Sequence, residues 1–232
     1  MKQLSTSKKI LTLVAILFVP GFLFITVNKT GANEYLSLPV FGNHFIPSMD
    51  EKEGVENVDK LNAHRIDSIS FLNLENEVYP VFANDTNVYL LHFFYAQDQN
   101  FSRDNLKQAK DIAEKAKRNK KIKVLSISPD PEDTPDLLKT SLQKNKVHEH
   151  TNWEVLSQPS RDIFDFARDE LFLDVFRNPI DSTEFFIDNV FLLVDSKHRI
   201  RGIYKPDLPK EMERLIDEVK VLIIEEYRLL EK

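Results

Sequence analysis

The clearest pattern along the chain is a set of short apolar runs separated by polar or amphipathic segments. Residues 87–95 form a nearly continuous apolar run rich in aromatic side chains, which is typical of a strand covered on both faces. Residues 121–128 and 184–194 predict two further strong strands, and residues 153–156 a short one. Two hairpins are expected. One joins extended chain over 66–74 to 78–82, and the other joins 184–194 to 199–204.

Between these strands, four segments carry the signals of helices. In residues 101–119, one apolar stripe is formed by Leu106, Ala109, Ile112, Ala113 and Ala116. The loop at 129–135 leads to a helix for which Thr134 is a suitable N-cap and Pro135 a first-turn proline. Residues 161–168 predict a short helix, and residues 209–230 an amphipathic helix that packs on the sheet.

The order of the elements indicates the fold class. A hairpin is followed by strand, helix, strand and helix, and then by a second hairpin and a closing helix. Such alternation favours a mixed sheet with helices on both faces. This is the thioredoxin arrangement, so we expect residues 64–232 to form an α/β domain with a thioredoxin-like mixed sheet and flanking helices.

The N-terminal segment has a different character. Residues 10–27 are an 18-residue run without a charged side chain, just long enough to cross a hydrocarbon core of about 30 Å at about 1.5 Å per residue. Because Lys2, Lys8 and Lys9 precede this run, the positive-inside rule places residues 1–9 in the cytoplasm. Residues 28–63 are then a tether, and residues 64–232 face the periplasm or outside of the cytoplasmic (inner) membrane. The alternative is a cleaved signal peptide, but the apolar stretch is long for one and residues 27–32 are a poor cleavage signal.

Composition excludes several kinds of chemistry. The chain has no Cys, which excludes a disulfide, a Cys-based metal site, a thiol nucleophile and a lipoprotein attachment site. It contains neither of the common Gly-rich phosphate-binding motifs. The first 30 residues carry a charge of +4 and the whole chain −6, so the remainder carries −10. An acidic body of this kind argues against nucleic-acid binding.

The most distinctive motif is SISPDPEDTP at residues 126–135. Together with residues 64–71, 89–95, 152–156 and 190–195, it resembles the Sco/SenC family of membrane-anchored, thioredoxin-fold copper proteins. The motif is similar to the family's ISVDPERDTP stretch but one residue shorter between the acids. The likeness runs from about residue 64 to the end, and the anchor and residues 38–43 resemble the tether of some members.

The departures from this family fall on its chemistry. The family places Cys-x-x-x-Cys after the first core strand and a His before the late strand, a soft ligand set suited to copper. In this chain the Cys positions fall on Gln97 and Phe101, and the His position on Ile187 or Asp188. These side chains do not hold Cu(I), and without a thiolate there is no disulfide exchange. The resemblance therefore implies the scaffold, with no catalytic residue, metal ligand or cofactor.

Near the degenerate site, three residues are open to a functional or a structural interpretation. His92 interrupts an apolar strand, either as an acid/base or ligand group or as a hydrogen-bonded core histidine. Asp98 and Asn100 lie where a thioredoxin fold presents its chemistry, at a helix N-terminus. They either contribute to binding in that loop or cap the helix.

Two clusters outside the degenerate site are also ambiguous. His148 and His150 form the only dense histidine cluster, which is either a metal site or part of a solvated connector. Asp130, Glu132 and Asp133 either offer oxygen ligands to a hard cation or belong to a solvated loop that leads to a helix cap.

Three functional hypotheses follow. The first is a non-catalytic, membrane-anchored, Sco-like protein that acts as a binding or assembly factor through a protein partner in the envelope, for example in respiratory-complex assembly. The second is a copper chaperone or other metal-binding protein with non-cysteine ligands drawn from His92, His148, His150 and Asp188. The third, a thiol oxidoreductase, is excluded by the lack of Cys. We favour the first, and expect no enzymatic activity and no cofactor.

Overall fold

The structure of the chain is a computed structural model that describes residues 14, 16, 18–22, 37–42, 64–83, 86–96, 101–142, 152–178, 180 and 185–230. The chain divides into two compact units, Met1–Leu36 and Ser37–Lys232. In the first unit, residues 18–22 are helical. Among the helices that the structure describes, none has the combination of length and apolar character needed to cross a membrane. Most of the expected anchor, residues 10–27, lies outside the described residues, so the anchor stays a prediction.

The second unit is built on a five-stranded sheet with the strand order β5-β4-β3-β8-β9. Its strands are β3 (Val88–Phe93), β4 (Ile122–Ile127), β5 (Trp153–Leu156), β8 (Phe191–Val194) and β9 (Ile200–Tyr204). β3, β4 and β5 run parallel, whereas β8 is antiparallel to β3 and β9 is antiparallel to β8. The expected mixed sheet is therefore confirmed.

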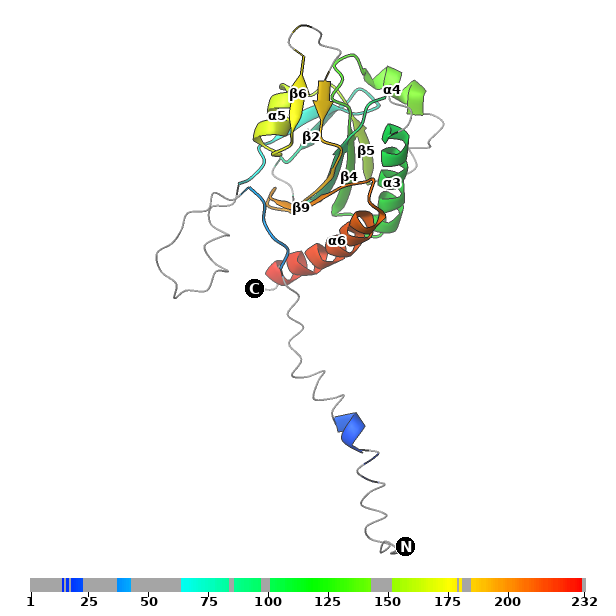
Figure 1. Cartoon of the computed structure of the whole chain (residues 1–232), viewed down its shortest axis with the longest axis vertical. Coiled ribbons are helices and arrows are strands. Elements are labelled where there is room, and N and C mark those ends of the chain that lie inside the picture. The colour runs from blue at the N-terminus through cyan, green and yellow to red at the C-terminus, as the bar shows by residue number, and fades with distance from the viewer. Residues whose placement is uncertain are drawn as a thin grey trace, which may run out of the picture. The chain divides into compact units, whose positions relative to one another are not determined.

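Helices cover both faces of this sheet, as the alternation of elements predicted (Figure 1). On one face, α3 (Phe101–Ala116), α4 (Pro135–Leu142) and α6 (Pro209–Leu230) contribute to one apolar cluster. On the other face, α5 (Ile163–Asp169) contributes to a second cluster. Strand β3 supplies both clusters, with Leu90 on the α3 side and Leu91 on the α5 side. This explains why its sequence is apolar at nearly every position.

Capping side chains define two of the helix starts. The backbone N–H of Leu137 donates to Thr134 Oγ1 at 3.4 Å, which confirms the predicted cap of α4. The side chain of Asp162 accepts from the N–H groups of Phe164 and Asp165, so α5 begins at Ile163 and not at residue 161 as expected.

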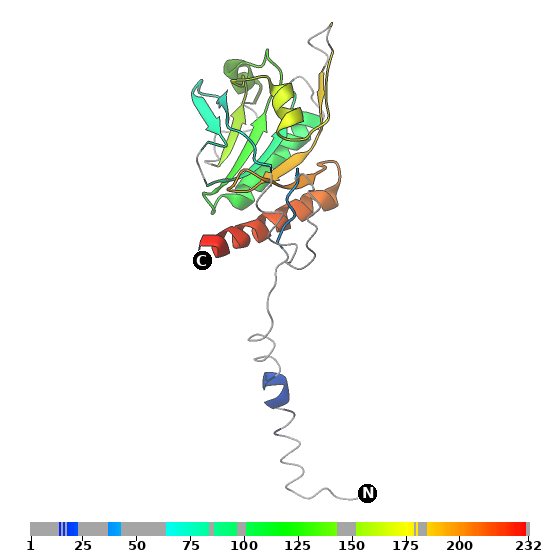
Figure 2. The same cartoon turned by 90° about the vertical axis from the view of Figure 1, so that its left-hand side faces the viewer.

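Two hairpins lie beside the main sheet. β1 (Ile69–Leu72) pairs with β2 (Val78–Val81) as the sequence predicted. β6 (Val175–Arg177) pairs with β7 (Phe185–Ile187) in a separate two-stranded sheet, which projects from the body in Figure 2. The prediction of one continuous strand over 184–194 is therefore wrong. The Val190 N–H donates to the Asp188 carbonyl and turns the chain, so that β7 and β8 enter different sheets.

Part of the expected tether belongs to the second unit. The guanidinium of Arg201, which is only 2% exposed, donates to the carbonyl of Leu38 at 2.6 Å and to that of Pro39 at 3.0 Å. It also pairs with Asp195 at 3.1 Å and with Glu225 of α6 at 2.9 Å. Burial raises the pKa of Asp195, but the bonds and charges of its arginine partners outweigh burial and bring that pKa below its usual value. This buried network ties the segment Ser37–Gly42 to the end of α6.

Candidate functional site

The candidate site lies where the parallel strands β3 and β4 end and α3 begins. Carboxyl ends of neighbouring parallel strands share one edge of a sheet, and that edge is where α/β folds bind ligands. The loop after β3 and the loop after β4 meet there, because the Phe94 N–H donates to the Ile127 carbonyl at 3.0 Å. The loop after β4 contains the distinctive motif of residues 126–135.

Asp133 holds these two loops together. Its side chain is 5% exposed, accepts a short hydrogen bond from the Ser128 hydroxyl, and accepts a second from the backbone of Ala96. Burial raises the pKa of this carboxyl, against the lowering effect of the Ser128 bond, and the nearby charges of Asp130 and Glu132 raise it further. The motif therefore supports the segment that follows β3. Among the described residues, no group of three His, Cys, Asp or Glu side chains could hold a metal ion.

Tyr95 ties the loop after β3 to the end of β7. Its hydroxyl accepts from the Ile187 N–H at 2.8 Å and donates to the Ile187 carbonyl at 3.4 Å. The ring also contacts Phe185, at 5.3 Å between centroids. Because one hydroxyl binds both backbone groups of Ile187, the end of β7 is held against the loop that follows β3.

The segment after β7 is held from two other directions. The Asp188 carboxylate accepts from the Asp174 N–H at 3.0 Å, and the Asp188 N–H donates to the Asp174 carbonyl. Asn189 accepts from the side chain of Asn105, on α3, at 2.6 Å. The carboxylate of Asp188 is thus engaged with the β6–β7 hairpin, while its neighbour faces α3.

The structure brings together only part of the degenerate site. Ile187 is 1% exposed and belongs to the apolar cluster on the α5 side. Phe101 is the first residue of α3. Gln97, Asp98 and Asn100 lie outside the described residues. The assignment of Gln97 to a Cys position of the family, and the roles of Asp98 and Asn100 in binding or capping, therefore stay predictions.

His92 is fully buried in the core, and both ring nitrogens are bonded. Nδ1 lies 3.2 Å from the Phe93 carbonyl and Nε2 lies 2.7 Å from Ser126 Oγ. A carbonyl only accepts, so these partners assign the proton to Nδ1, and the Ser126 hydroxyl donates to Nε2. Trp153 Nε1 in turn donates to Ser126 Oγ at 2.9 Å, which completes the chain of bonds.

Burial also decides the charge of His92. It lowers the pKa of this side chain to about 4, against the raising effect of the bond to Phe93, so the ring is neutral at pH 7. The ring stacks on Phe191 at 4.4 Å between centroids. With 0% exposure and no free nitrogen, His92 acts in the core as a hydrogen-bonded histidine. The other histidine candidates, His148 and His150, lie outside the described part of the chain.

The sequence interpretation missed Tyr95, Asn105 and Asn189. The apolar pattern places Tyr95 in the aromatic strand, although a tyrosine at a strand end next to a loop is a signal for a hydroxyl that needs a partner. The two asparagines lie 84 positions apart and carry no local signal of their contact.

Comparisons with known proteins identify the fold. No protein-family model matches the sequence, and no curated protein matches it. A SCO1/SenC family lipoprotein from Bacillus anthracis matches with a TM-score of 0.59 and 22% identity over 69% of this chain and 95% of that chain. BsSco, described as a member of the Sco family of cytochrome c oxidase assembly proteins, matches with a TM-score of 0.53 and 19% identity, covering 68% of this chain and 93% of that one.

A third match is yeast Sco1 with copper bound, at a TM-score of 0.52 and 13% identity, covering 68% of this chain and 89% of that one. At sequence identities this low, the structural similarity shows a shared fold and nothing about activity. The second unit has the thioredoxin-like fold of the Sco/SenC proteins, which confirms the scaffold that the sequence resemblance implied. The chain carries this scaffold without a single Cys.

Proposed function

We propose that this protein is a membrane-tethered, Sco-like protein without catalytic activity, which acts as a binding or assembly factor outside the cytoplasmic membrane. The fold supports a relation to the Sco proteins, of which BsSco is described as belonging to cytochrome c oxidase assembly proteins. The replaced reactive positions support a role without copper transfer or thiol chemistry.

One observation carries the proposal: the backbone of Ile187 is bound by Tyr95. When the sequence is aligned with the Sco/SenC family pattern, Ile187 or Asp188 takes the place of the copper-binding His. Here Ile187 points into the apolar core, its N–H and carbonyl are both occupied by one hydroxyl, and the carboxylate of Asp188 is occupied by the Asp174 N–H. Hydrogen bonds between protein groups thus hold this end of the domain together, which supports a structural role for these positions.

Cu(I) titration of the full chain in detergent micelles, against a colorimetric chelator, tests the absence of copper chemistry. We expect no stoichiometric binding by the natural chain. The matched variants Q97C/F101C/D188H and Q97C/F101C/I187H restore the family's ligand types, and we expect at least one to bind one Cu(I). Stoichiometric binding by the natural chain in the low-nanomolar range or tighter would overturn the proposal and favour non-cysteine ligands.

Location and partner are tested separately. The chain has no Cys, so a single K197C substitution at an exposed position provides the only thiol. A membrane-impermeant maleimide should label it in intact spheroplasts; labelling that requires lysis would contradict the proposed topology. A photo-crosslinker placed at residue 97 should then capture a specific envelope protein, and the same crosslinker at the exposed Lys107 is the control.

A further inference from the structure

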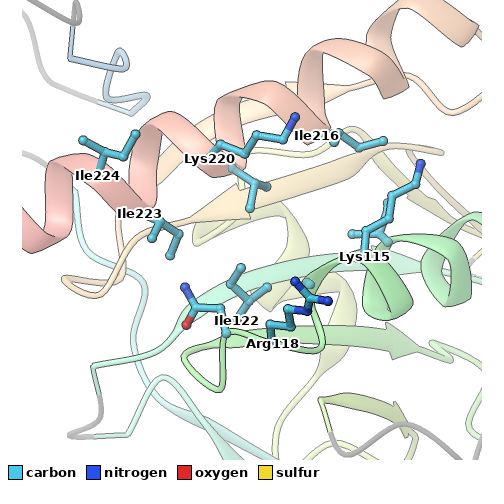
Figure 3. A pocket seen from close by; sticks show the side chains of 11 residues that line it. Lys115, Arg118, Ile122, Ile216, Lys220, Ile223 and Ile224 are labelled. Carbon is cyan, nitrogen blue, oxygen red and sulfur yellow. The ribbon is translucent and has the colours of Figure 1, made fainter. Parts of the chain in front are cut away.

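An apolar pocket lies between α3 and α6, at the opposite end of α3 from the candidate site (Figure 3). Its volume is about 320 Å³, at the lower end of the range of about 300–1,000 Å³ found for small-molecule pockets. Its apolar lining comes from the last turns of α3, the start of β4 and the middle of α6: Ile112, Ala116, Ile122, Ile216, Val219, Ile223 and Ile224.

The rim of this pocket is cationic. Lys115 and Arg118 lie on one side and Lys220 on the other, and no acidic residue lines the pocket. Lys220 pairs with Asp217 at 2.8 Å. Lys115 and Arg118 form no ion pair with any residue that the structure describes. Two unpaired cations beside an apolar recess in a chain of net charge −6 are complementary to an anion joined to an apolar group.

The volume favours a single chain of carbon atoms over a larger surface. At about 30 Å³ for each water-sized group, the pocket holds about ten such groups. A stable protein–protein interface buries about 800 Å² per partner. A docked protein helix would therefore need a larger contact surface than a recess of this volume. The apolar floor of the recess offers no partner for the hydroxyl groups of a sugar.

We propose that this pocket binds a monomeric single-chain amphiphile with an anionic headgroup, such as a medium-chain carboxylate. The hydrocarbon chain lies against the isoleucines of β4 and α6, and the headgroup is bound by Lys115 and Arg118. This site is independent of the proposed function, since it uses none of the residues of the degenerate copper site.

The test is photolabelling of the full chain in phosphatidylcholine nanodiscs with a diazirine derivative of decanoate, followed by peptide mapping. We expect labels within residues 112–122 and 216–224. Decanoate should compete about tenfold better than decanol or decyltrimethylammonium, all kept below their critical micelle concentrations. The K115A/R118A variant should weaken competition by decanoate about tenfold, or about 1.4 kcal/mol, and leave competition by decanol unchanged. The matched control is K107A/K210A, which removes two exposed lysines elsewhere on the same helices.

A second variant tests directly whether the pocket itself is the binding site. I216W fills the pocket from a partly exposed position of α6 and should abolish specific labelling, with the melting temperature reported alongside. Equal competition by all three amphiphiles, an unchanged result for K115A/R118A, or labels outside the lining peptides would each overturn the proposal. Absence of labelling together with a cross-link from α6 to another segment of this chain would show that the chain itself fills the pocket, and would overturn it as well.

Discussion

Replacing His92 with Gln should remove an acid sensitivity from the folded domain. The ring is neutral in the folded state because burial lowers its pKa to about 4, whereas in the unfolded chain the pKa returns to its ordinary value of 6.5. Between these values the unfolded state binds a proton that the folded state does not. Stability therefore falls as the pH falls from about 6.5, and the loss is complete below about 4.

The size of the effect follows from the two pKa values. A shift from 6.5 to about 4 corresponds to roughly 3 kcal/mol at full development. Relative to pH 7.5, the loss is roughly 1 kcal/mol at pH 5.5 and roughly 2–3 kcal/mol at pH 4.5. Exposure does not reduce this figure, because the side chain of His92 is 0% exposed.

Urea unfolding of the Ser37–Lys232 unit, followed by the fluorescence of Trp153, measures this loss. Between pH 7.5 and 4.5, the free energy of unfolding of the natural unit should fall by roughly 2–3 kcal/mol more than that of H92Q. The carboxylates Asp133 and Asp195, which also titrate in acid, are common to both proteins and cancel in the difference. An equal acid dependence of the two proteins, or an NMR titration of His92 with a midpoint near 6.5, would refute the reasoning.

Three further predictions concern contacts that join distant segments. Y95F should lower the free energy of unfolding by about 1 kcal/mol and speed hydrogen exchange at the Ile187 amide. The exposed control Y227F should do neither, and unchanged exchange in Y95F would contradict the role assigned to the hydroxyl. R201L should lower the free energy of unfolding by about 3–5 kcal/mol, because Glu225 and the carbonyls of Leu38 and Pro39 lose their buried donor, while Asp195 stays bound to Arg199; it should also open residues 37–42 to proteolysis. Its exposed control, R214L, should lose at most about 1 kcal/mol, and an equal loss in the two would show that burial is not the cause. D133A should cost about 1–3 kcal/mol, because the Ser128 hydroxyl and the Ala96 backbone lose their acceptor, whereas E132A should change stability by less than about 0.5 kcal/mol; a larger effect of E132A would argue against this assignment.

The candidate site was only partly predictable. The motif at 126–135 located the loop beside the site, because Pro, Asp and Thr in that order are signals of a turn and a helix cap. The prediction of one strand over 184–194 failed, because apolar character is the same in β7 and β8 and does not show that they enter different sheets. The short strand β6 gave no clear signal, since Phe176 and Arg177 are exposed and its partner β7 lies in a separate hairpin.

Periodicity and composition are local properties of the chain, and they were enough to predict the central strand β3, the apolar stripes of α3 and α6, and the absence of any thiol. Tertiary structure alone decided that Tyr95 binds the backbone of Ile187, 92 positions away, and that Arg201 binds Leu38, 163 positions away. Those bonds depend on which loops the folded sheet brings to one edge. A hydroxyl or guanidinium satisfies its hydrogen bonds with whatever backbone group the fold places within reach, and no spacing in the sequence records that choice.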